Sequence, residues 1–256
     1  MPRLLKTVIP RIRRSIKDRG VVASLCRSYL LPVHLVHEYR LNRGLRKSGY
    51  QSEFDRTHCV DTDGEYEGCT YLSDLEIPSQ NWIEGINYIP IAPREFNSVM
   101  LCLDIAWEEY TFIDYGSGKG RALLLASEYP FKRIIGLEFS PQLHLAAETN
   151  IALYRSGSQK CRKIQSLNID FTQFVLPQEP LVLYFNHPCR ERVLDDVVKS
   201  VGDFLLTSPH PMYLAYLAVG PQQHQRLLSG GFLEEIYRSP NFRFIIYQRV
   251  ASSGRP

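Results

Sequence analysis

The sequence predicts an α/β protein built on a doubly wound, mostly parallel sheet of seven strands that ends in an antiparallel hairpin. From about residue 93, short apolar segments alternate with amphipathic or Leu/Ala-rich ones, as in strand–helix–strand units. A glycine-rich turn follows the first apolar segment and leads into a helical one. Two further strand-like segments close the chain. Together these features place helices on both faces of a parallel sheet.

The parallel strands are expected at 111–115, 133–138, 162–168, 180–185 and 212–219, of which 162–168 is the weaker, less apolar third strand. The helices expected around them are 94–103, 119–129, 140–154, 190–206 and a short one that ends at Gly230-Gly231. The first has its apolar residues on one side, the second stops before Pro130, and the third begins at Ser140 with Pro141 in its first turn. Segments 232–237 and 242–249 form the closing hairpin.

Right-handed crossovers would bring the carboxyl ends of the parallel strands to one edge of the sheet. Four polar residues stand at or near those ends: Asp114, Glu138, Asn168 and Asn186. Ligands of doubly wound sheets bind at this edge, at the point where the strand order reverses. We therefore expect the functional site there.

The composition is that of a globular chain. Of 256 residues, 44% are apolar and 22% charged, which excludes wholesale disorder and a coiled coil. The six cysteines form no CxxC pair, which argues against a zinc ribbon and for a reduced, cytoplasmic protein. No apolar run approaches the roughly 20 residues of a membrane-spanning helix.

Charge and turn-forming residues divide the chain into three parts. Residues 1–50 hold 12 Lys/Arg and only two acids, so we expect a basic helical extension there. Such a segment could bind anionic lipid or nucleic acid, or be a transit peptide, but the favoured interpretation is a helix packed on the main domain with its basic face in water. Residues 51–87 are expected to be a connector with short elements, and 88–256 the ligand-binding domain.

The central motif is the stretch Asp114-Tyr115-Gly116-Ser117-Gly118-Lys119-Gly120-Arg121, which joins the first strand to a helix. Glycines permit a tight turn and the close approach of a ligand to the backbone. Glu138 ends the next strand, where a carboxylate can accept hydrogen bonds from both hydroxyls of a ribose. Loop, helix and acid together indicate a pocket for an adenosine-containing ligand.

The glycine spacing narrows the choice of nucleotide. A dinucleotide-binding turn needs a third glycine where Arg121 stands, and a phosphate-binding loop of the G-x-x-x-x-G-K-[ST] type does not fit. The stretch instead resembles the first motif, D/E-x-G-x-G-x-G, of class I S-adenosylmethionine-dependent methyltransferases. The closing hairpin is also similar to that family, and the resemblance covers about residues 88–249. It implies a Rossmann-like methyltransferase fold with S-adenosyl-L-methionine as cofactor.

The resemblance also implies roles for particular residues. The methionine part of the cofactor would be held by four of them: Asp114, Gly116, Ser117 and Gly118. The nucleoside part would be held by Glu138 on the ribose, Phe139 on the adenine ring, Asp170 on the adenine amino group and Ile169 as an apolar neighbour. The alternatives are that Asp170 is a solvent-facing turn residue and Phe139 part of the core. Tyr88-Ile89-Pro90 resembles a stretch that closes over the cofactor in some lysine-directed members.

At the end of the fourth strand stands Asn186-His187-Pro188-Cys189, which resembles the [DN]-P-P-[FY] motif of amino-directed methyltransferases. Asn186 and Pro188 match that motif, whereas His187 and Cys189 depart from it and remove its aromatic residue. We expect Asn186 and His187 to be catalytic, with His187 as a general base. The alternative is that His187 is a hydrogen-bonded loop residue. Cys189 as a nucleophile is disfavoured, because no base is placed beside it.

The leading interpretation is a methyltransferase whose acceptor is a protein side chain or a small molecule. The alternative is an S-adenosylmethionine-binding protein without turnover, docked on a membrane or another partner through residues 1–48. Nucleic acid is a less favoured partner and a nicotinamide dehydrogenase a third possibility, which Arg121 disfavours. No metal is expected, since His34, His37 and Glu38 lack further ligands.

Overall fold

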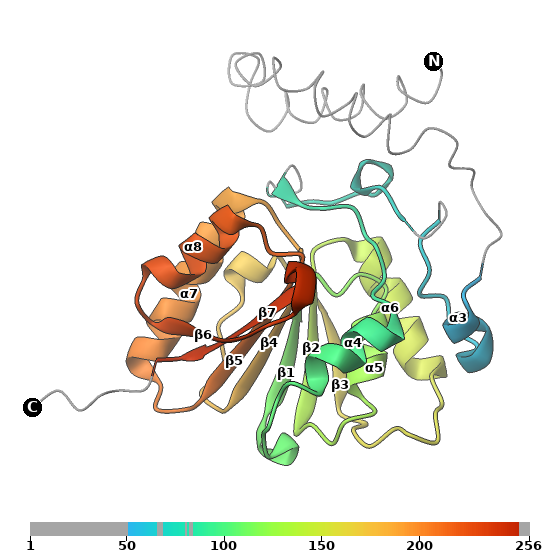
Figure 1. The fold of residues 1–256 in the computed structure, drawn as a ribbon. Helices are drawn as coiled ribbons and strands as arrows, with labels where there is room; N and C mark the ends of the chain where they lie inside the picture. Colours follow the sequence, from blue (N-terminus) through green and yellow to red (C-terminus); the bar gives the residue numbers. More distant parts are fainter. Residues whose placement is uncertain (1–50, 66–68, 80, 82–83, 251–256) are drawn as a thin grey trace, which may run out of the picture.

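The computed structural model describes residues 51–65, 69–79, 81 and 84–250, and a seven-stranded sheet forms its centre (Figure 1). The strand order is β3-β2-β1-β4-β5-β7-β6. The strands are β1 Thr111–Tyr115, β2 Arg133–Glu138, β3 Ile164–Asn168, β4 Leu181–Asn186, β5 Met212–Leu217, β6 Leu233–Arg238 and β7 Phe244–Arg249. The first five pair in parallel, and β7 runs antiparallel to both β5 and β6. This topology confirms the predicted fold class.

Helices cover both faces of the sheet, with α7 and α8 on one side and α4 to α6 on the other (Figure 1). The α-helices are α3 Glu53–His58, α4 Pro93–Met100, α5 Arg121–Ala126, α6 Pro141–Leu153, α7 Glu191–Thr207 and α8 Pro221–Ser229. The short 3-10 helices are η1 Leu72–Asp74, η3 Trp107–Glu109, η4 Phe171–Gln173 and η5 Pro240–Phe242. Strand and helix alternate along the chain from β1 to β5, as doubly wound sheets require.

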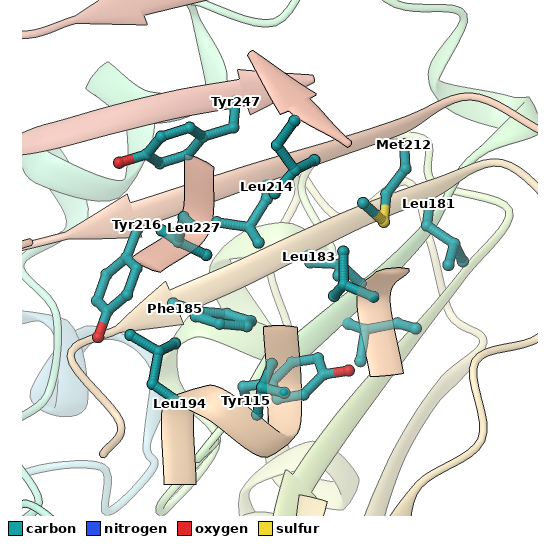
Figure 2. Close-up of a cluster of buried hydrophobic side chains, with 14 of the residues drawn as sticks. Tyr115, Leu181, Leu183, Phe185, Leu194, Met212, Leu214, Tyr216, Leu227 and Tyr247 are labelled. Atoms are coloured by element: carbon teal, nitrogen blue, oxygen red, sulfur yellow. The ribbon is translucent and has the colours of Figure 1, made fainter. Parts of the chain in front are cut away.

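The core lies in two layers because successive strand residues point to opposite faces. On β1, Phe112 faces the layer of α4 and α5, and Ile113 faces that of α7 and α8. Figure 2 shows the second layer, in which Phe185 of β4 lies near Leu194 of α7. All five residues of β1 are buried, as expected for a central parallel strand covered on both sides.

The elements differ from the predicted ones mainly at their ends. The predicted helix 119–129 is too long, since α5 spans only Arg121–Ala126. Its cap, Gly120, has φ +87°, so the glycine turn continues to the first helical residue. The strand predicted for 212–219 stops at Leu217 because Ala218 is left-handed, with φ +53°. The cap at Ser140 and the position of Pro141 are confirmed, and Ser140 Oγ accepts from the amide of Leu143.

The described part of segment 51–87 contains α3 and η1 and is bound tightly to the sheet domain. Thr70 forms an isolated antiparallel bridge with Tyr88, and Gly85 forms one with Cys189. Asp55 of α3 is completely buried. The predicted connector is therefore a covering layer in the structure, because its backbone pairs with residues at the carboxyl edge of the sheet.

The predictions for residues 1–50 lie outside the described residues, as do His34, His37 and Glu38. Of the helices that the structure describes, none is long and apolar enough to cross a membrane. Over the same described ranges, no group of three or more His, Cys, Asp and Glu side chains is placed to hold a metal ion.

Candidate functional site

The site lies at the carboxyl edge of the sheet, where β1, β2 and β4 end. A cavity of about 280 Å³ opens there. Because β1 lies between β2 and β4, this is the point where the strand order reverses. Eight of the ten predicted site residues line the cavity: Asp114, Gly116, Ser117, Glu138, Phe139, Asp170, Asn186 and His187. The structure thus brings together residues from four strand ends.

The other two predicted residues lie just outside the cavity lining. The Ile169 side chain packs against the core layer of α7 and α8, and its amide donates to the Glu138 carbonyl at 3.0 Å. Gly118 is covered by the ring of Tyr88. A Cβ added to Gly118 would lie 2.1 Å from that ring, and its φ is +55°, so only glycine fits this position.

The glycine loop is held against the end of β2. The amides of Gly116 and Ser117 both donate to the Leu137 carbonyl, at 2.9 and 3.0 Å. These bonds turn the chain sharply away from β1 and expose its backbone toward the cavity. Gly116 has φ +85° and lies against the ring of Pro188, so the loop also contacts the end of β4. The glycine loop and the 186–189 motif are therefore in contact beside the cavity.

Two buried carboxyl groups face the cavity. Glu138 accepts hydrogen bonds from the amides of Gly118 and Ser140, both at 2.8 Å. Asp114 is 2% exposed. Burial raises the pKa of Asp114 to about 8, with a further contribution from Glu138, and burial raises the pKa of Glu138 to about 7. A cation placed in the cavity would stabilise both carboxylates.

Because of these acids, we expect the ligand-free protein to lose stability as the pH rises from 6 to 9. Both pKa values are higher in the folded chain than the ordinary values near 4, so the folded chain holds more protons between about pH 4 and pH 8. The stabilisation is complete below pH 4 and is lost progressively as the pH rises from 4 to 8.

Asp114→Asn isolates this effect, because the amide stays neutral. At pH 9 the variant should be more stable than the wild type by about 1 kcal/mol or more, whereas the difference should shrink at pH 6. Urea unfolding at the two pH values measures both. Parallel stability curves for the two proteins would contradict the assigned burial of Asp114.

A strap of residues 84–91 crosses the carboxyl edge above the cavity. The Arg190 amide donates to the Glu84 carbonyl at 2.9 Å, and Asn186 Nδ2 donates to the Ile89 carbonyl at 3.3 Å. Between these contacts, the Tyr88 hydroxyl donates to the Thr62 carbonyl at 2.6 Å. The strap therefore joins the 186–189 motif, the glycine loop and the segment around Thr62.

Arg121, the first residue of α5, anchors that segment. Its NH2 group lies 3.1 Å from Asp55 and 2.7 Å from Asp63, and its Nε donates to Thr62 Oγ1 at 2.6 Å. All three charged side chains are at most 8% exposed. Burial alone would raise the pKa of Asp63, but hydrogen bonds from Ser52 and Arg121 hold it below the usual value.

This buried network was not predicted from the sequence, where Arg121 is only the residue that replaces a glycine and segment 51–87 only a connector. A signal was present, since a second basic residue directly after the glycine loop and a connector with nine acids are candidates for pairing. The spacing of almost 60 residues gave no indication of which would pair.

The 186–189 motif forms the part of the cavity wall at the end of β4. His187 has φ +48°, a left-handed conformation that is rare for residues other than glycine and asparagine. Its ring centroid lies 6.4 Å from that of Tyr216. Cys189 is 1% exposed, and burial, with Glu84 and Asp170, raises its thiol pKa to about 12. A thiol with so high a pKa is a poor nucleophile near pH 7.

One end of the cavity contains Phe139 and Asp170. Phe139 is half-buried and packs against Leu72 and Ile77 of the covering segment. Asp170 caps η4 and accepts hydrogen bonds from Ser79, Asn81 and Thr172. Asp170 is thus partly buried and connected to the covering segment. Its predicted contact with adenine stays a prediction.

No protein-family model matches the sequence, and a search of curated proteins gave no significant match. Among solved structures, the chain is similar to an S-adenosylmethionine-dependent O-methyltransferase of Thermotoga maritima, with 14% identity and a TM-score of 0.46 over 66% of this chain and 69% of that one. An RNA methyltransferase of Salinibacter ruber, in complex with S-adenosyl-L-homocysteine, matches at 14% identity and a TM-score of 0.43, over 66% and 97%. An S-adenosylmethionine-dependent methyltransferase of Leishmania major matches at 11% and 0.45, over 61% and 70%. All three identities lie between 11% and 14%, and all three TM-scores between 0.43 and 0.46.

Proposed function

We propose that this protein transfers a methyl group from S-adenosylmethionine to an acceptor bound at the 186–189 motif. The observation that carries the proposal is the pair of buried carboxyl groups, Asp114 and Glu138, on either side of a glycine turn at the point where the strand order reverses. A ligand that suits this pair has a cationic group at one end and a diol at the other. S-adenosylmethionine carries both, as an ammonium and a ribose.

Six of the predicted residues then have a proposed role in binding the cofactor. The Asp114 carboxylate has no hydrogen bond from any residue that the structure describes, so it is available to the ammonium of the methionine part. Glu138 accepts from the ribose hydroxyls, and Phe139 lies against the adenine. The backbone of Gly116 and Ser117 borders the methionine part, and Gly118 lets the Tyr88 ring close over the loop.

When bound, the cofactor supplies a methyl group that its sulfonium already activates. The protein's main contributions are to align the acceptor's lone pair with that methyl and to exclude water. The strap suits the second task, since it covers the cavity and is hydrogen-bonded to Asn186 at its acceptor end. This assignment needs no covalent intermediate on Cys189.

Asn186 and His187 are the residues proposed to orient the acceptor and take its proton. Nδ2 of Asn186 is engaged with the Ile89 carbonyl, which leaves its Oδ1 to accept a hydrogen bond from the acceptor. His187 is the titratable residue of this wall whose ordinary pKa lies near neutrality. The acceptor itself is proposed to be a protein side chain or a small molecule.

The proposal is tested by incubating the full chain with methyl-labelled S-adenosylmethionine and a fractionated cell lysate. We expect label in one class of acceptor with the wild type and none with Asp114→Asn. Titration with S-adenosylhomocysteine should show binding by the wild type. Absence of binding together with absence of transfer would overturn the proposed function.

His187→Asn separates catalysis from binding. Asparagine tolerates a positive φ, so the backbone should keep its conformation. Loss of a general base should lower methyl transfer by about 100-fold or more. Affinity for S-adenosylhomocysteine, measured by calorimetry, should stay within about twofold, because His187 is proposed to contact the acceptor and not the cofactor. Unchanged transfer would make His187 a loop residue without a catalytic role.

A further inference from the structure

The adenine end of the cavity contains a polar residue from the covering segment that the sequence analysis did not single out. Asn81 lines the cavity together with Leu72, Phe139 and Asp170. We infer that the Asn81 amide oxygen, oriented by Asp170, accepts the hydrogen bond from the exocyclic amino group of the nucleobase. This inference rests on the proposed function and names the residue that selects adenine over a 6-oxopurine.

Asp170 has little capacity left for the nucleobase. Its Oδ1 accepts from the Thr172 amide at 3.0 Å and the Thr172 hydroxyl at 2.7 Å. Its Oδ2 accepts from the Ser79 hydroxyl and from Asn81 Nδ2, the latter at 2.9 Å. A carboxylate offers about four lone-pair positions, so these four donors fill it. An adenine amino group could bind Asp170 only by displacing one of them.

The same contacts fix the orientation of the Asn81 amide. Burial by itself would raise the pKa of Asp170, but the hydrogen bonds from Ser79 and Thr172 outweigh it and hold that pKa below the usual value. Asp170 is therefore ionised at neutral pH and can only accept. The NH2 group of Asn81 must face it, and the same group lies 3.4 Å from Thr172 Oγ1.

The amide oxygen is the polar atom that remains. Within residues 51–65, 69–79, 81 and 84–250, no donor is hydrogen-bonded to Asn81 Oδ1. Asn81, which carries this oxygen, lies in the lining of the cavity, as does the half-buried ring of Phe139. A purine packed against that ring could donate a hydrogen bond from its amino group to this oxygen. A 6-oxopurine presents a carbonyl at the same place, which would oppose the Asn81 oxygen and bind less well.

The test compares S-adenosylhomocysteine with S-inosylhomocysteine, in which a carbonyl replaces the amino group, by calorimetry on the full chain. The wild type should bind the adenosine compound about 10- to 100-fold more tightly, the range expected for one polar contact. In Asn81→Leu, which keeps the volume and removes the acceptor, the ratio should fall to within about threefold. Asn81→Ser is measured in the same way if the leucine variant does not fold.

Because the ratio is taken within each variant, a general loss of affinity lowers both values and leaves the ratio unchanged. Gln173→Ala is the matched control, since Gln173 is exposed on η4 and, within the described ranges, its side chain is hydrogen-bonded to neither Asp170 nor Asn81; it should keep the wild-type ratio. A wild-type ratio near one, or a ratio that persists in both Asn81 variants, would overturn the inference while the proposed function stood. If the wild type binds neither compound, the proposed function itself fails.

Discussion

Arg121→Ala should lower the free energy of unfolding by about 3–5 kcal/mol, the cost of removing one partner from a buried charge network. Asp55 and Asp63 would then remain buried without their counter-ion, since their side chains are 1% and 8% exposed. The segment that carries Thr62 would also lose its anchor, and with it the hydrogen-bond partner of Tyr88. Urea unfolding, followed by circular dichroism, measures the loss.

Lys119→Ala provides the matched control, because it removes a neighbouring ion pair in which one partner is exposed to solvent. Lys119 Nζ lies 3.0 Å from Asp61, whose side chain is 76% exposed. An ion pair with one partner in water should contribute less than about 1 kcal/mol. If the two variants were equally stable, burial of the Arg121 network would not stabilise the fold as described.

Glu138→Ala should lower the affinity for S-adenosylhomocysteine by about 100-fold or more. The proposed role gives Glu138 two charge-assisted hydrogen bonds to the ribose, each of about 1.5–3 kcal/mol. The substitution also removes the acceptor of the Gly118 and Ser140 amides, which hold the loop beside the cavity. Glu138→Gln keeps an acceptor and the volume but loses the charge, so its affinity for S-adenosylhomocysteine should lie between that of the alanine variant and that of the wild type.

Glu148→Ala is the control for this second prediction. Glu148 lies on α6, the helix after Glu138, and its side chain is 55% exposed outside the cavity. Its affinity for S-adenosylhomocysteine should equal that of the wild type in the same calorimetric titration. Wild-type affinity in Glu138→Ala would show that the ribose is held elsewhere.

The fold was predictable because its signals are local. Each central strand is a short apolar run, since both of its faces are buried. Ser140 and Pro141 mark the start of α6, the first by its capping hydroxyl and the second by its fixed φ. The glycine turn and Glu138 could likewise be placed at one edge, because parallel strands bring their carboxyl ends together. These features could be predicted because they do not depend on how side chains from distant segments pack.

The remainder depends on contacts between distant segments. Arg121 pairs with residues 58 and 66 positions earlier, and Asn81 meets Asp170 across 89 positions. Segment 51–87 has no periodicity that would show which of its residues face the sheet. The ends of α5 were predicted wrongly for another reason: the left-handed Gly120 delays the helix by two residues, and the leucine-rich stretch after it gives no sign of where the helix ends.

A crystal structure of the full chain with S-adenosylhomocysteine tests the central claim most directly. The account predicts that the ribose hydroxyls lie within hydrogen-bond distance of Glu138, the ammonium beside Asp114 and the adenine against Phe139. Density for the ligand at another surface, or a cavity that stays filled by protein at saturating ligand, would contradict it.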